Sequence, residues 1–175
     1  MKTKQLVLCA LFCALTIIFA QLIIPTTPVQ FSLSILPVLL CGFVLSPKYA
    51  FFTQLAYILL GAAGLPVLGK FMGGLGALFG PTGGYVLSYP LMALVCSFIA
   101  GKANTKNIFI NFLCQIPSLL ICYIAGSTYL AFNMHTSFYA ALAAGVFPFI
   151  LFDIIKLAVC SLAASLLKHH KALAN

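Results

Sequence analysis

The chain of 175 residues is long enough for one domain, and its 63% hydrophobic and 6% charged residues exclude an ordinary soluble protein. We expect a single membrane domain, residues 1–175, with an all-α fold, because a segment in lipid must satisfy its own backbone hydrogen bonds. The net charge of +8 does not indicate nucleic-acid binding, since the lysines are scattered and form no basic face.

Hydrophobic runs predict six membrane-spanning helices. A span needs roughly 20 apolar residues, and the first run is near this length and continues through Ile24. We therefore expect it to be retained as a helix and not cleaved as a signal peptide. The shorter second and third runs, joined by a tight turn, are typical of a helical hairpin. The six predicted spans are residues 6–24, 31–45, 50–63, 85–100, 108–126 and 140–167.

Two small residues, Ala10 and Ala14, lie one turn apart in the first span. Small residues at this spacing allow a second helix to approach closely. The sequence leaves open whether that helix belongs to this chain or to a different subunit.

The segment between the third and fourth spans, residues 64–84, has eight glycines among 21 residues and is otherwise mostly apolar. Non-helical backbone at membrane depth must be buried in protein or line a cavity. We expect this glycine-rich segment to be a lid over a substrate site. The alternative is a membrane-surface loop that only caps the helices.

The fifth span carries a polar stripe at helical spacing, formed by Asn111, Gln115, Ser118 and Cys122. Such a stripe indicates hydrogen bonds between helices more often than a binding site. The residues that follow it, 127–138, are predicted to form a mixed loop.

The sixth span contains Asp153, the only acidic residue of the chain, and Lys156 three residues later. On a helix the two side chains share a face, and Pro148 is expected to kink the helix one turn earlier. Charged side chains in a membrane helix face protein or a wet cavity. Two interpretations stay open: a structural ion pair between helices, or a polar anchor for a solute.

The lysines predict the topology. Six spans place both termini on one side together with seven lysines, and only Lys70 falls on the other side. The positive-inside rule then places both termini in the cytoplasm, in a multi-pass protein of the cell (inner) membrane. The glycine-rich segment is extracytoplasmic in this topology, on the face where a solute arrives.

Residues suited to catalysis are scarce. One carboxylate is too few for metal-assisted phosphoryl transfer, there is no Walker A pattern for ATP hydrolysis, and no histidine lies deep in a predicted span. The seven cysteines are dispersed without a CxxC spacing. We expect no metal, no cofactor and no enzyme activity, but a binding cavity with one carboxylate and one ammonium.

Four motifs occur in order along the chain. They are Leu45-Ser46-Pro47-Lys48-Tyr49, Gly61-Ala62-Ala63-Gly64-Leu65-Pro66-Val67, Gly80-Pro81-Thr82-Gly83-Gly84-Tyr85 and Asp153-Ile154-Ile155-Lys156. Each motif is weak alone, but the third followed at this distance by the fourth is specific. Over nearly the whole chain the sequence resembles the BioY family of biotin transporters.

The resemblance implies a substrate-capture subunit, the S component of an energy-coupling factor transporter, which binds biotin from outside and mediates its uptake. It implies a transmembrane coupling subunit and two cytoplasmic ATPases as partners. It also makes Ala10 and Ala14 docking residues for the coupling subunit.

When the site residues of the family are transferred to the matching positions of this chain, the resemblance implies that Asp153 and Lys156 hydrogen-bond the ureido ring of biotin. A ureido group offers two N–H donors and a carbonyl acceptor, which a carboxylate and an ammonium complement. The resemblance further implies a pocket wall formed by Tyr85 and by the backbone at Thr82, Gly83 and Gly84.

The chain departs from the family pattern at three positions. Ser34 stands where the first loop usually carries Gln, Val86 where some members carry Arg, and Lys70 where small or amide residues are usual. We hypothesise that Lys70 meets the biotin carboxylate; the alternative is a snorkelling lysine at the membrane interface. The alternative functions are an S component for another vitamin, a non-transporting membrane scaffold, and an intramembrane enzyme.

Overall fold

Apolar helices make up most of the computed structural model, which describes residues 2–24, 31–103 and 106–173. The beginning of the first loop, residues 25–30, lies outside the described residues. The longer helices are α1 Lys2–Gln21, α2 Ile35–Val44, α3 Pro47–Ala62, α6 Tyr89–Ala103, α7 Ile108–Asn133 and α9 Ile150–Leu173. The shorter elements are β1 Ile23–Ile24, β2 Phe31–Ser32, η1 Gly69–Phe71, α4 Leu75–Leu78, α5 Gly83–Leu87, α8 Phe138–Gly145 and η2 Phe147–Phe149.

The length and apolar composition of the helices agree with the all-α membrane fold that the sequence predicted. Four helical stretches of the described chain are long and apolar enough to cross a bilayer: Thr3–Gln21, Gly83–Ala103, Ile108–Asn133 and Phe138–Leu167. Helices α2 and α3 are shorter than these, with 10 and 16 residues. The chain is therefore a multi-pass membrane protein.

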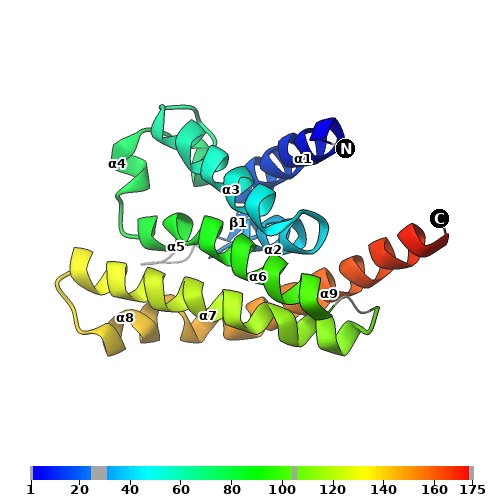
Figure 1. Ribbon diagram of the computed structural model, residues 1–175. Helices are drawn as coiled ribbons and strands as arrows, with labels where there is room; N and C mark the ends of the chain where they lie inside the picture. Colours follow the sequence, from blue (N-terminus) through cyan, green and yellow to red (C-terminus); the bar gives the residue numbers. More distant parts are fainter. Residues whose placement is uncertain (1, 25–30, 104–105, 174–175) are drawn as a thin grey trace.

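Helix α6 lies at the centre of the fold. It packs against α2 and α3 on one side and against α7 on the other, and α7 also packs against α8 and α9. Figure 1 shows the resulting arrangement, with α7, α8 and α9 on one side of α6 and α1 to α3 on the other. The core between these layers contains fully buried Leu39, Met92 and Leu157.

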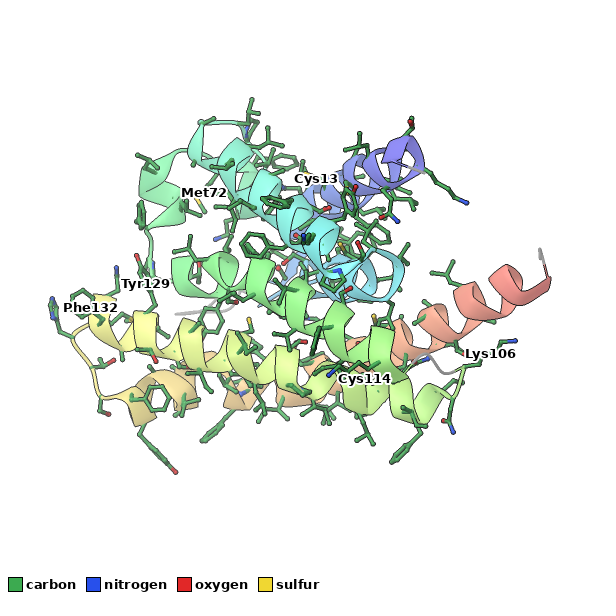
Figure 2. All side chains as sticks on the ribbon, viewed as in Figure 1. Cys13, Met72, Lys106, Cys114, Tyr129 and Phe132 are labelled. Atoms are coloured by element: carbon green, nitrogen blue, oxygen red, sulfur yellow. The ribbon has the colours of Figure 1, made fainter. Side chains whose placement is uncertain are left out.

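The two ends of the molecule differ in what they carry. The beginning of α1 and the end of α9 lie at one end, and α4, the start of α5 and the turn from α7 to α8 lie at the other (Figure 1). Lys106 lies at the end that holds the termini, whereas Met72, Tyr129 and Phe132 lie at the opposite end (Figure 2). The glycine-rich segment is therefore far from both termini.

The structure corrects two expectations and bears out a third. The predicted loop at 127–138 is wrong for residues 127–133, which continue α7. Tyr129 and Asn133 on these added turns both donate to the carbonyl of Phe79, which ties the end of α7 to the glycine-rich segment. That segment is also less irregular than predicted, because it contains η1 and α4. The kink at Pro148 is present, since η2 separates α8 from α9 there.

Candidate functional site

A cavity of about 110 Å³ lies where the ends of α1, α3, α6 and α9 approach the glycine-rich segment. Its walls come from segments far apart in the chain, including the residues just before α2 and the middle of α7. The polar and ionisable side chains that line it are Ser32, Ser34, Tyr57, Thr82, Tyr85, Tyr89, Cys122, Tyr123, Asp153 and Lys156. The remaining wall is apolar, as is usual for sites that bind small molecules.

Asp153 and Lys156 form a buried ion pair in this cavity. Lys156 Nζ lies 2.9 Å from Asp153 Oδ1, and each side chain is 4% exposed. The pair forms because residues three apart on α9 project from the same face. Neither group faces lipid. Each charge is compensated by the other member of the pair, within the protein and at the wall of the cavity.

Each member of the pair has a further partner from another element. Lys156 Nζ donates to the carbonyl oxygen of Ser32 at 2.7 Å. The hydroxyl of Tyr123 on α7 donates to Asp153 Oδ2 at 2.7 Å. A carboxylate has about four acceptor positions, so the hydrogen bonds that Asp153 accepts from Lys156 and Tyr123 leave it able to accept from a bound molecule.

A second polar group in the wall is the hydroxyl cluster around Ser34. Ser34 is almost fully buried, and its Oγ lies 2.6 Å from the Tyr89 hydroxyl and within hydrogen-bond distance of Ser32 Oγ. The ring of Tyr89 stacks on that of Tyr57, with centroids 6.2 Å apart. This part of the wall therefore presents flat aromatic surface edged with hydroxyl groups.

The other predicted site residues separate into two groups. Thr82 and Tyr85 line the cavity together with Ser34, Asp153 and Lys156. The structure does not bring Gly83, Gly84 and Lys70 into its lining.

Gly83 and Gly84 are packing positions. A Cβ at Gly84 would run into the side chain of Tyr129 and would lie 3.0 Å from the carbonyl oxygen of Ala125, while one at Gly83 would run into the carbonyl of Leu78. Gly84 lets α5 lie directly on α7, and Gly83 lets it follow closely on the end of α4; α5 in turn carries Tyr85 to the cavity.

Lys70 is exposed, although both Gly69 before it and Met72 beyond it line the cavity. The ammonium group of Lys70 thus belongs to the outer side of the same turn whose inner side forms part of the wall. Its contact with a ligand stays a prediction.

Sequence reasoning missed three tyrosines of the site, Tyr57, Tyr89 and Tyr123. A signal existed for Tyr89, because it lies four residues after Tyr85 and so on the same helical face. Tyr123 follows Cys122, the last member of the polar stripe on α7. Tyr57 had no signal in the sequence, since its position depends on how α3 packs against α6.

The polar stripe on α7 has two roles, hydrogen bonding to α9 and lining of the cavity. Gln115 Nε2 donates to Ser161 Oγ at 2.7 Å and to the carbonyl of Leu157 at 3.3 Å, both on α9. The predicted interhelical hydrogen bonding is confirmed at this residue. Cys122, two turns further along, instead lines the cavity.

Ala10 and Ala14 lie in a different hollow, an open groove of about 640 Å³ between α1 and α3. Both alanines are exposed, and the groove is lined almost entirely by apolar side chains. A helix from outside the chain could therefore approach α1 closely along these two residues.

Comparison with known proteins gives a consistent result. A family model described as the BioY family matches residues 1–173. A probable biotin transporter BioY of Pyrococcus horikoshii is 39% identical over 168 residues, which are 96% of this chain and 98% of that protein. The biotin transporter BioY of Thermotoga maritima is 40% identical over 166 residues, 94% of this chain and 96% of that protein.

A solved structure has the same fold. It is the crystal structure of the S-component for biotin from an ECF-type ABC transporter, with a TM-score of 0.88 and 26% sequence identity. The similarity covers 96% of this chain and 92% of that chain, so it extends over the cavity and the groove alike.

Proposed function

The chain belongs to the BioY family, and on this basis we propose that it captures biotin from outside the cell and mediates its uptake as the S component of an energy-coupling factor transporter. The names of its relatives and of the matching structure support this function. Proteins of this kind are transporter subunits and not enzymes.

The observation that carries the proposal is the buried pair of Asp153 and Lys156 on the wall of a small cavity. The ureido ring of biotin is neutral and has two N–H donors and one carbonyl acceptor. Asp153 accepts from the N–H groups, and Lys156 donates to the carbonyl. Hydrogen bonds with one charged partner are roughly twice as strong as neutral ones, so the pair selects a cyclic urea over an apolar ring.

The rest of the cavity suits the remainder of biotin. Tyr85 and Thr82 provide wall, and the stacked rings of Tyr57 and Tyr89 offer flat apolar surface for the thiophane ring. Ser34 acts through the hydroxyl cluster that it forms with Tyr89. Gly83 and Gly84 act by placing α5, and not by touching the ligand.

Lys70 meets the biotin carboxylate at the mouth of the cavity. Among the described residues that line the cavity, Lys156 is the one cation, and it is already paired. Val86, which stands where some family members carry Arg, lies in the wall. The valeryl chain therefore points outward, and its carboxylate reaches the exposed Lys70 beside Gly69 and Met72.

The topology has six spans, with both termini in the cytoplasm and the glycine-rich segment acting as an extracytoplasmic lid. The termini and the lid lie at opposite ends of the fold (Figure 1), which supports placing them on opposite sides of the membrane. Seven lysines on the side of the termini against one on the lid side agree with the positive-inside rule. α2 and α3 complete the spans as the shorter pair.

The coupling partner docks on α1. The open apolar groove at Ala10 and Ala14 supports contact with a helix of a transmembrane coupling subunit, which in turn joins two cytoplasmic ATPases. This chain has one carboxylate side chain and no Walker A motif. The partner ATPases therefore hydrolyse the ATP that drives uptake.

The experiment that tests the function is direct binding of biotin to the detergent-purified protein by isothermal titration calorimetry, with thiamine and riboflavin as comparison ligands. The proposal expects saturable binding of biotin alone. Binding of another vitamin in its place would assign the same architecture to a different substrate, and binding of none would leave a scaffold subunit.

A further inference from the structure

The glycine-rich segment contains a strained turn in residues 69–71. Leu68 and Met72 pair across it, with Leu68 N donating to the carbonyl of Met72 at 3.0 Å. Inside the turn Lys70 has φ 59° and Phe71 has φ 55°, both in the left-handed region. For residues other than glycine this conformation is unfavourable because Cβ comes too close to the following carbonyl oxygen, so the turn needs support from outside.

That support comes from Gln21, the last residue of α1. Its Oε1 accepts from the backbone N–H of Phe71 at 2.8 Å. Its Nε2 donates to the carbonyl of Leu68 at 3.0 Å and to that of Val67 at 3.2 Å. One side-chain amide therefore holds both ends of the turn.

A side-chain amide matches this position. Phe71 N–H is a donor and requires an acceptor, whereas the carbonyls of Leu68 and Val67 require a donor, and a glutamine side chain offers both. Nε2 also lies 3.2 Å from the carbonyl of Ile17, which keeps the side chain anchored on its own helix.

The turn held by Gln21 is part of the cavity wall. Gly69 lies so close to the end of α1 and to β1 that a Cβ there would come within 2.9 Å of Ile23 Cδ1 and 3.5 Å of the Ala20 carbonyl oxygen. Ala20, Ile23 and Gly69 all line the cavity. A shift of the end of α1 therefore moves the turn and changes the mouth of the cavity.

We propose that Gln21 is a positioning residue that latches the 69–71 turn across the mouth of the cavity and so slows the escape of the bound ligand. The same helix carries the groove at Ala10 and Ala14, so the latch also connects the lid to the surface on which the partner docks. The identity of the ligand rests on the proposed function, but the latch itself does not.

The test compares wild type, Gln21→Leu and the control Gln5→Leu, which makes the same change near the other end of α1. Two quantities are measured on detergent-purified protein: hydrogen exchange of the Phe71 amide without ligand, and the dissociation rate of radiolabelled biotin. We expect Gln21→Leu to release biotin about tenfold faster, because it removes the three hydrogen bonds from Gln21 to the turn, and even one ordinary hydrogen bond corresponds to a factor of about ten. We also expect the Phe71 amide to lose its protection, while Gln5→Leu matches wild type.

If Gln21→Leu does not fold, Gln21→Glu replaces it, since glutamate has the same shape and keeps the acceptor for Phe71. It should release biotin faster while the Phe71 amide stays protected. Unchanged release of biotin from a folded Gln21→Leu or Gln21→Glu protein would overturn the latch. If the wild type binds no biotin, the proposed function fails, and the exchange of the Phe71 amide alone decides the latch.

Discussion

Asp153 and Tyr123 meet across two helices, with the Tyr123 hydroxyl of α7 donating to Asp153 Oδ2 of α9 at 2.7 Å. The other carboxylate oxygen, Oδ1, is held by Lys156. The single carboxylate of the chain is therefore fixed from two sides, so that its plane has one orientation toward the cavity. A site that recognises a planar urea by hydrogen bonds requires such a fixed acceptor.

Replacing Tyr123 by phenylalanine tests this orientation. Tyr123→Phe removes one hydrogen bond to Asp153 and leaves the ring in place, so we expect the dissociation constant of biotin to rise about fivefold to tenfold. Calorimetric titration measures it. Tyr139→Phe, an exposed tyrosine on α8, is the matched control and should bind as wild type. Equal affinity of Tyr123→Phe and wild type would show that the carboxylate needs no such support.

The role of Lys70 is tested by a pair of ligands. If its ammonium meets the biotin carboxylate, Lys70→Ala weakens the binding of biotin but not that of biotin methyl ester, which lacks the negative charge. The expected loss for biotin is about 1.5-fold to fivefold, since an exposed ion pair contributes roughly 0.2–1 kcal/mol. The control is Lys102→Ala, an exposed lysine that lies over the ring of Phe98. The same small change for both ligands would make Lys70 a snorkelling lysine.

Gly84 is predicted to be intolerant of a side chain. Gly84→Ala places a methyl group against Tyr129 and the Ala125 carbonyl, and overpacking of this kind costs about 1–3 kcal/mol. We expect a lower midpoint of thermal unfolding in detergent. Gly101→Ala on α6 is the matched control, because a Cβ there meets nothing within 4 Å. It should leave the midpoint unchanged or raise it slightly, since alanine is favoured over glycine in a helix by about 1 kcal/mol.

Filling the groove on α1 separates binding from docking. Ala14→Leu adds bulk to the open groove and should leave biotin binding by the isolated protein unchanged, since Ala14 does not line the cavity. Copurification with the coupling subunit and ATP-dependent uptake should both be lost. Ala158→Leu, an exposed alanine on α9, is the control and should retain both. Normal uptake by Ala14→Leu would exclude this groove as the docking surface.

Local geometry made part of the site predictable. Asp153 and Lys156 could be paired from sequence because three residues along a helix always bring side chains to one face, and their charge excluded lipid as their environment. The partners of the pair could not be found in this way. Tyr123 comes from another helix, and the acceptor for Lys156 at Ser32 is a backbone carbonyl, which no residue type reveals.

The same limit explains the errors in the fold. Residues 127–133 look like a loop because Ser127, Thr128 and Asn133 are polar, yet they extend α7 because two of these added residues bond Phe79 of a distant segment. Gly64 and Gly74 in this segment adopt positive φ angles, which glycine does at little cost. In the turn itself, however, Lys70 and Phe71 adopt these angles, and the compensating contact comes from Gln21 on α1.

The central claim is that the buried pair exists for the ligand and not only for the fold. Asp153→Asn leaves Lys156 charged and buried without its carboxylate, which should cost about 3–5 kcal/mol of stability. The double variant Asp153→Asn with Lys156→Met removes both charges, so its thermal unfolding should return toward that of wild type. The decisive measurement is the dissociation constant of biotin for this folded double variant. We predict that it rises at least about a hundredfold, as expected when two charge-assisted hydrogen bonds are lost; a value equal to that of wild type would contradict the account and make the pair purely structural.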